Sequence, residues 1–97
     1  MYVKFHSSTN CDLLAICDEE LIGQKFEEGD FFLDVSIEFF KGEKKTVLEV
    51  KDLILNFDNL NLVGEKTIEI ALEMEIISKE EVSSVKGIPH AIVVSGG

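Results

Sequence analysis

The clearest periodicity in the sequence begins directly after Gly64 and continues to Ile77. Apolar residues recur at the helical spacing of three and four positions, at Ile68, Ala71, Leu72 and Ile76, with Ile70, Met74 and Ile77 beside them. The apolar run before Gly64 predicts a short buried strand over 59–63. We therefore expect a strand, a glycine turn and an amphipathic helix over 65–77 that packs its apolar side on a sheet. The rest of the predicted fold is arranged around this unit.

Other apolar runs, alternating or continuous, predict further strands over 2–6, 12–17, 31–37, 82–85 and 91–94. Asp18 is a suitable N-cap for a short helix over 19–26. Thr46 and Glu49 fit the capping box of another helix that reaches Phe57. That segment is rich in β-branched residues, so a strand remains an alternative. Loops or turns are expected over 38–45, 78–81 and 87–90.

Strands and helices alternate irregularly along the 97 residues, with no internal repeat or linker. A chain of this length forms one domain with one core. The pattern predicts a single α+β domain over 1–97. We expect a two-layer sandwich in which two or three helices cover a small sheet, mostly antiparallel or mixed.

The chain is strongly acidic, with 19 Asp and Glu against nine Lys and Arg and a net charge of −10. We therefore expect no direct non-specific binding to nucleic acid, because such binding needs a basic surface. Glu65, Glu69 and Glu73 recur every four residues on the predicted helix. They form either a solvated helix face or an acidic stripe that meets a basic partner.

Two cysteines are too few for a disulfide scaffold, so we expect reduced thiols and a cytoplasmic location. No apolar run approaches the length of a membrane span. A zinc site from His6, Cys11, Cys17 and His90 is not expected, because structural zinc ligands normally occur in closely spaced pairs. No metal, cofactor or catalytic residue is predicted. Cys17, next to three carboxylates, is expected to be buried and unreactive.

Two short segments hold polar residues at predicted turns. Pro89 fixes a rigid turn on which His90 either closes the backbone or contacts a ligand. Asn61, Gly64 and Glu65 stand where a strand passes into a helix, an arrangement that can bind anions. A phosphate site there is disfavoured, because Glu65 would repel it and only one glycine is present.

Three blocks of the sequence, Cys17–Gly23, Asn61–Glu65 and Gly87–Ala91, occur in the order and spacing of a known family. With them the chain resembles the small archaeal family catalogued as domain of unknown function number 424. The resemblance extends from Tyr2 to about Ala91. It implies an archaeal cytosolic protein with a two-layer α+β fold. It supplies no activity, so no catalytic residue is transferred.

The preferred hypothesis is a non-enzymatic interaction module for a protein or ribonucleoprotein partner, in translation or RNA metabolism. It would use the acidic helix face and the Pro89–His90 corner. The candidate binding residues are Asp18, Glu19, Glu20, Asn61, Gly64, Glu65, Glu69, Glu73, Pro89 and His90. The alternative is a small-ligand-binding protein or minor enzyme that uses Asn61, Glu65 and His90. A third hypothesis is self-association through an exposed sheet edge.

Overall fold

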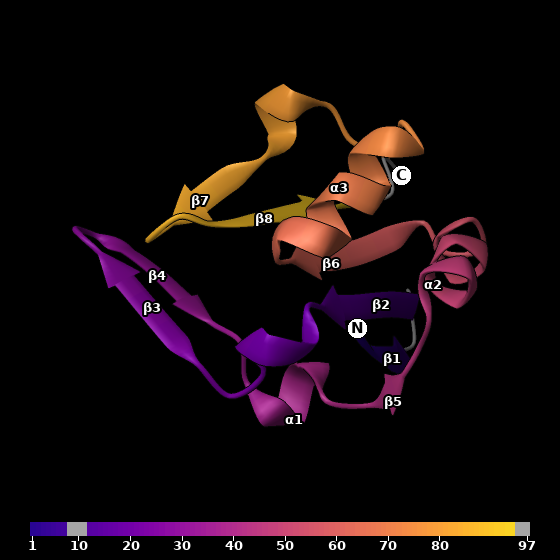
Figure 1. The fold of residues 1–97 in the computed structure, drawn as a ribbon, viewed down its shortest axis with the longest axis horizontal. Helices are drawn as coiled ribbons and strands as arrows, with labels where there is room; N and C mark the ends of the chain where they lie inside the picture. Colours follow the sequence, from indigo (N-terminus) through magenta and orange to yellow (C-terminus); the bar gives the residue numbers. More distant parts are fainter. Residues whose placement is uncertain (8–11, 95–97) are drawn as a thin grey trace.

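A computed structural model describes residues 1–7 and 12–94 (Figure 1). In these residues six strands form a mixed sheet, in the order β5 (Glu43–Lys44), β1 (Tyr2–Ser7), β2 (Asp12–Cys17), β6 (Asn59–Val63), β8 (Ile88–Val93) and β7 (Ser83–Val85). β2 and β6 are parallel, and the other neighbours are antiparallel. A separate hairpin pairs β3 (Lys25–Glu28) with β4 (Phe31–Asp34). The predicted α+β class with a mixed sheet is confirmed.

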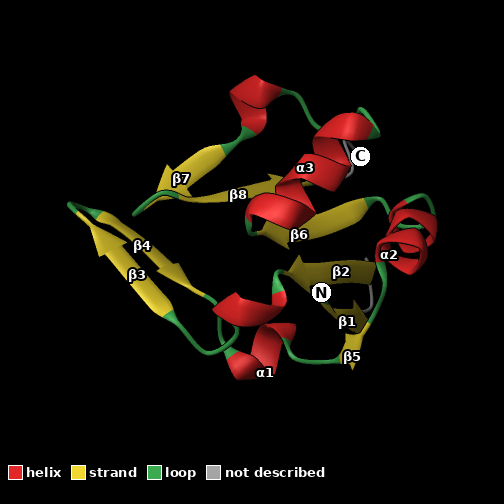
Figure 2. Ribbon diagram, in the orientation of Figure 1, coloured by secondary structure: helices red, strands yellow, loops and turns green. Residues whose placement is uncertain are grey.

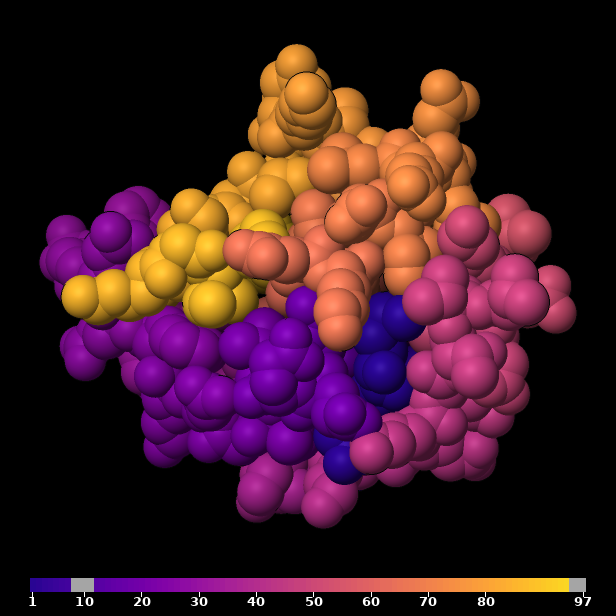
Figure 3. All heavy atoms as spheres, in the orientation of Figure 1, coloured from indigo at the N-terminus to yellow at the C-terminus, as the bar shows by residue number. Residues whose placement is uncertain are grey.

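Helices α2 (Val47–Ile54) and α3 (Glu65–Glu73) pack on one face of the six-stranded sheet, which we call the helical face. Figure 2 shows these helices beside the strands, and in Figure 3 their side chains form the surface around part of the N-terminal segment. The core of this face comes from alternate strand residues packed against the two helices, namely Val3, Leu14, Ile16, Leu60, Leu62 and Ala91 against Val50, Ile54, Ile68 and Ala71.

The opposite face of the sheet, the hairpin face, is covered by short elements. These are the 3₁₀ turn η1 (Glu19–Leu21), the one-turn helix α1 (Ile37–Phe40) and the β3–β4 hairpin. They place apolar side chains over the strand residues that alternate with the helical core, namely Leu21, Leu33, Val35 and Phe40 over Ala15, Cys17, Val63 and Val85. The sheet is therefore covered on both faces, by different kinds of structure.

The predicted strand–glycine–helix unit is present as β6, Gly64 and α3, although the helix ends at Glu73 and not at Ile77. Gly64 has a φ of +111°, which L-residues rarely adopt, and it is the N-cap of α3 without a side chain to cap it. The capping is done from another part of the chain. The Asp18 carboxylate accepts hydrogen bonds from the backbone N–H of Lys66 at 3.0 Å and of Thr67 at 2.9 Å.

The prediction that Asp18 caps a helix over 19–26 is wrong. That segment forms only the η1 turn, and the chain then enters β3, because Gly23 with a φ of +81° turns it away from the helical path. Asp18 makes no side-chain cap to η1. Asp18 is 2% exposed, and its carboxylate caps α3 through the N–H of Lys66, 48 residues away in the sequence.

The strand predicted over 31–37 ends at Asp34, because the Ser36 side chain accepts a hydrogen bond from the N–H of Phe39 and starts α1. The segment 38–45, predicted as a loop, contains most of α1 and the short β5. The helix predicted from the capping box at Thr46 is confirmed as α2, with both reciprocal hydrogen bonds formed, and it ends at Ile54. The strand alternative for this segment is wrong.

The tight turn predicted over 87–90 lies one residue earlier. Lys86 and Gly87 form the two-residue loop between β7 and β8, with φ values of +54° and +78°, as a type I′ turn requires. Pro89 and His90 therefore belong to β8. The Pro89 carbonyl accepts a hydrogen bond of 2.8 Å from the N–H of Gly64, which joins this strand to the start of α3.

Candidate functional site

His90 is held in the interior of the six-stranded sheet. In β8 it lies opposite Val63 of β6 on one side and Ser83 of β7 on the other. Because successive strand residues point to opposite faces, His90 lies on the hairpin face, together with Val63 and Val85. The rigid corner expected at Pro89–His90 is thus a strand segment, and the imidazole is fixed by β-sheet pairing on both sides.

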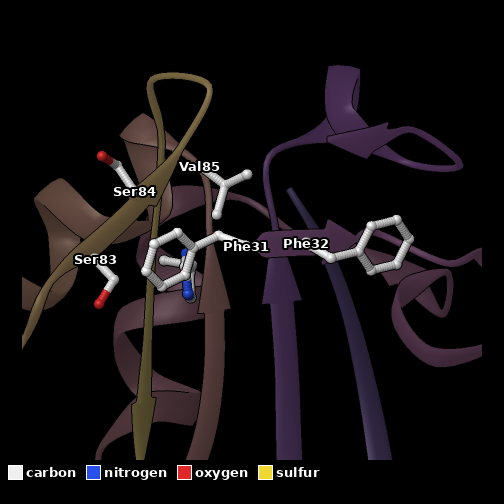
Figure 4. A pocket seen from close by; sticks show the side chains of 6 residues that line it. Phe31, Phe32, Ser83, Ser84 and Val85 are labelled. Carbon is white, nitrogen blue, oxygen red and sulfur yellow. The ribbon is translucent and has the colours of Figure 1, made fainter. Parts of the chain in front are cut away.

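A cavity of about 240 Å³ lies between the two hairpins, and we call it the hairpin cleft. It is lined by Phe31, Phe32, Ser83, Ser84, Val85 and His90. Figure 4 shows the ring of Phe31 on the side of Ser83 and Val85, while the ring of Phe32 points the opposite way. Phe31 is 69% exposed and Phe32 is 59% exposed. The exposed ring of Phe31 gives the cleft an apolar edge at the surface, and exposed apolar surface beside a cavity is typical of interaction sites.

The hairpin cleft contains a buried polar atom without a partner. Nδ1 of His90 is buried, and no described residue forms a hydrogen bond with it. Leaving such an atom unpaired costs about 1–3 kcal/mol, and native structures contain few of them. With the proton on Nε2, Nδ1 accepts a hydrogen bond, and with the proton on Nδ1 it donates one. His90 lines the cleft while its Nδ1 is closed to solvent in the unbound protein, so a group that enters the cleft pairs with this atom only when the imidazole or the Phe31 ring shifts.

The tips of the two hairpins are joined at the rim of the cleft. The backbone N–H of Lys86 donates a hydrogen bond of 2.9 Å to the Oε1 of Glu28. Figure 1 shows the β3–β4 tip beside the β7–β8 turn. This link positions Phe31, at the start of β4, next to β7. Ile92, which is 60% exposed, and Asn61, the diagonal neighbour of His90, lie on the same face of the sheet but do not line the cleft.

The other sequence-predicted site residues lie in separate places. Asn61 and His90 share the hairpin face, whereas Glu65 opens α3 on the helical face. Among the described residues, Glu65 makes no hydrogen bond or ion pair with either of them. Glu65, Glu69 and Glu73 are all exposed, and Glu73 lies 4.0 Å from Nζ of Lys51. The acidic stripe and His90 thus belong to opposite faces of the sheet.

The predicted Asp18–Glu20 group is also divided. Asp18 accepts three hydrogen bonds, from two backbone N–H groups of α3 and, at 2.8 Å, from the Thr67 hydroxyl. It therefore fills the position at the helix N-terminus where an external anion would bind. Glu19 pairs with Lys44 at 2.5 Å, and this hydrogen bond lowers the pKa of the Glu19 carboxyl. The Glu20 residue is exposed.

Cys17 is fully buried beneath the elements of the hairpin face. Burial, followed by the charge of Asp18, raises the pKa of its thiol to about 12. A thiol with this pKa is a poor nucleophile at neutral pH. Over residues 1–7 and 12–94, no three His, Cys, Asp or Glu side chains gather as metal ligands, and Cys11 lies outside the described residues. None of the described helices combines the length and apolarity needed to cross a membrane.

Sequence reasoning missed five residues of the cleft, Phe31, Phe32, Ser83, Ser84 and Val85. One signal was available for the first two. Adjacent strand residues point to opposite sides, so the Phe31–Phe32 pair cannot place both rings in one core. No comparable signal marks the serines, because their role depends on the pairing of β7 with His90.

The fold and the cleft define a small α+β domain with a side-chain-sized cavity between two hairpins. The profile of the family described as "Protein of unknown function (DUF424)" matches residues 5–95, and the chain belongs to this family. The resemblance seen in the three sequence blocks is thereby confirmed. No curated protein matches the sequence.

A solved structure has a similar fold. It is the crystal structure of an uncharacterized conserved protein from Methanopyrus kandleri, with a TM-score of 0.76. The two sequences are 18% identical, and the match covers 99% of this chain and 93% of that chain. At this identity the likeness is one of fold.

Proposed function

We propose that this protein is a non-enzymatic interaction module that binds a protein partner through the hairpin cleft. The observation behind this proposal is the buried, unpaired Nδ1 of His90 in a cavity flanked by exposed Phe31. A partner that enters the cleft supplies the missing hydrogen bond and covers apolar surface. Both gains arise only on binding, so they favour the complex over the free protein.

The size of the cleft supports a macromolecular partner over a free metabolite. Pockets for drug-sized ligands and cofactors usually measure about 300–1,000 Å³, and the hairpin cleft measures about 240 Å³. A space of this size fits one side chain that projects from a larger surface. The exposed ring of Phe31 provides apolar contact area beside such an anchor.

The surroundings of His90 also favour binding over catalysis. In triad-type catalytic sites a third group orients the general base through a hydrogen bond. In the described part of the chain, His90 Nδ1 has no such partner. The acidic stripe on α3 adds a different contribution, because surface charge mainly accelerates the encounter with a basic partner.

Affinity capture tests the proposal. The tagged protein is incubated with an extract of its source organism, with and without nuclease, beside the variants His90→Phe and Phe31→Leu. Leu48→Ala serves as the control, because Leu48 is 79% exposed on α2, on the other side of the sheet. We expect a protein that is retained by the wild type and the control after nuclease treatment and lost from both cleft variants.

A protein that both cleft variants capture as well as the wild type does would contradict the proposal. Loss of the protein on nuclease treatment alone would show that RNA bridges the complex, and direct protein binding through the cleft would then be rejected. A captured partner is finally purified and titrated against the wild type, so that direct binding is measured without other components.

A further inference from the structure

The charge around the hairpin cleft indicates what kind of side chain fits it. On the β3–β4 hairpin, Glu28 shares the side of Phe31 and Asp30 stands at the turn, whereas Lys25, Glu27 and Asp34 lie on the opposite side with Phe32. The η2 turn (Lys79–Glu81), which leads into β7, adds two carboxylates and one lysine, and Lys86 stands at the β7–β8 turn. Carboxylates thus outnumber cations on the two hairpins and their approach. A cationic group is attracted to this surface and an anionic group is repelled.

The lining of the cleft adds two requirements. Phe31 offers an exposed ring, and the faces of aromatic rings attract cations. His90 offers a buried Nδ1 that lacks a partner among the described residues, and the Ser83 side chain lines the same cavity. A fitting group is therefore cationic, stacks on a ring and donates more than one hydrogen bond.

We propose that the hairpin cleft receives an arginine side chain of the partner protein. The guanidinium stacks on Phe31 and donates a hydrogen bond to Nδ1 of His90, whose proton is then on Nε2. This inference rests on the proposed function and names the partner's anchoring residue. Arginine fits better than lysine because its guanidinium is planar, stacks on aromatic rings, has five donors and is more weakly hydrated.

The acidic stripe of α3 is not part of this site. It lies on the helical face, whereas Phe31 and His90 act from the hairpin face. A second hollow, of about 460 Å³, lies beyond the end of α3 and is lined by residues such as Leu72, Ile76 and Ser78. Over residues 1–7 and 12–94, it contains no buried side-chain atom that lacks a hydrogen-bond partner. The hairpin cleft is therefore the site where a specific polar group is required.

A titration with short peptides tests the inference on the intact protein. The probes are four blocked tripeptides, with arginine, lysine, citrulline or glutamate between two glycines. Citrulline keeps the shape of arginine and lacks its charge. The readout is the ¹⁵N resonance of the imidazole nitrogens, which reports hydrogen bonding at each ring nitrogen. His6 is an internal control, because its Nε2 already bonds to the Phe39 carbonyl at 2.8 Å.

We expect the arginine peptide to move the His90 Nδ1 resonance and to leave His6 unchanged. Citrulline should bind about tenfold more weakly, because charge-assisted hydrogen bonds and cation–π contacts are both lost. Phe31→Leu should weaken the binding of the arginine peptide several-fold. Phe5→Leu, a matched change of an exposed phenylalanine on the helical face, should not alter it.

Equal binding of arginine and citrulline, stronger binding of the glutamate peptide, or no change at His90 with any peptide would each overturn the inference. These results would leave the proposed function standing if the captured protein still depended on Phe31 and His90. Conversely, if both cleft variants capture the protein as well as the wild type does, the proposed function is rejected, whatever the result of the peptide titration. The inference and the proposed function can therefore be rejected independently of each other.

Discussion

The two faces of the six-stranded sheet use alternate residues of the same strands but differ in how they are covered. On the helical face, α2 and α3 cover an apolar core in which Leu14, Leu60 and Leu62 are no more than 1% exposed. On the hairpin face the cover is equally close over Ala15 and Cys17 and ends before Ile92, which is 60% exposed. The first arrangement stabilises the fold. The second leaves Phe31 and Ile92 exposed, and Phe31 lines the cavity that we propose as the binding site.

If this comparison is correct, substitutions at the junction of the sheet with α3 should affect stability most. Gly64→Ala is expected to lower the free energy of unfolding by about 4 kcal/mol, through backbone strain and loss of the cap. A Cβ at this position would lie 2.3 Å from Cγ of Asp18, and φ is +111°. Denaturant unfolding measures the change. A loss below about 1 kcal/mol would contradict the described geometry.

Asp18→Ala is expected to cost about 3 kcal/mol, because three hydrogen bonds are lost and the buried Thr67 hydroxyl and N–H lose their acceptor. The double variant with Gly64→Ala should cost less than the sum of the two, since the alanine no longer meets a carboxylate. The same unfolding measurement gives this coupling. Additive costs would mean that Asp18 and Gly64 do not interact.

Alkaline pH should lower the free energy of unfolding, because Cys17 is buried under the covered half of the hairpin face. The pKa of Cys17 is about 12 in the folded protein, against 9.0 for an ordinary thiol. Its contribution to stability is therefore complete below pH 9 and is lost as the pH rises toward about 12. About 2 kcal/mol should disappear by about pH 11. In Cys17→Ala the free energy of unfolding should decline less steeply with pH. Identical declines in the two proteins would argue against a buried thiol with a raised pKa.

At the open half of the hairpin face the expected change has the opposite sign. His90→Phe should raise the free energy of unfolding by about 1 kcal/mol, because it removes a buried unpaired nitrogen and keeps the ring. The same variant should lose the captured partner. Reduced stability in denaturant unfolding would indicate that His90 has a structural role in the free protein.

The smallest effect on stability is expected from the acidic stripe of α3. Glu69→Lys with Glu73→Lys should change stability by less than about 0.5 kcal/mol, since both side chains are exposed. Association with a basic partner should slow, and its salt dependence should weaken. The charge-matched control reverses Asp52 and Asp58, which are exposed near the end of α2. Equal slowing by both pairs would show that only net charge matters.

Local patterns in the sequence predicted the elements whose determinants lie close together in the chain. The period of the Ile68–Leu72 segment predicted α3, and the capping box at Thr46 predicted α2. The Asp18 prediction failed because the N–H groups that donate to its carboxylate, at the start of α3, are 48 and 49 residues away, and distant donors cannot be inferred from local spacing.

His90 was identified as a candidate for a reason that the structure changes. The sequence analysis expected a turn at Pro89 to hold His90 in place. Both residues instead belong to β8, where His90 pairs with Val63 and Ser83. The cleft around His90 could not be predicted, because the predicted helix over 19–26 covers the first two residues of β3 and the sequence analysis predicts no strand that pairs with β4. Without β3, nothing placed Phe31 next to β7.

The central claim is that the hairpin cleft binds a partner and is not needed for folding. Its most direct test is the dissociation constant of the captured partner, measured by calorimetry for the wild type and His90→Phe and read beside the stability of each protein. The account predicts binding at least about tenfold weaker, with stability equal to or above that of the wild type. Unchanged affinity, or weaker binding that merely follows lost stability, would contradict it.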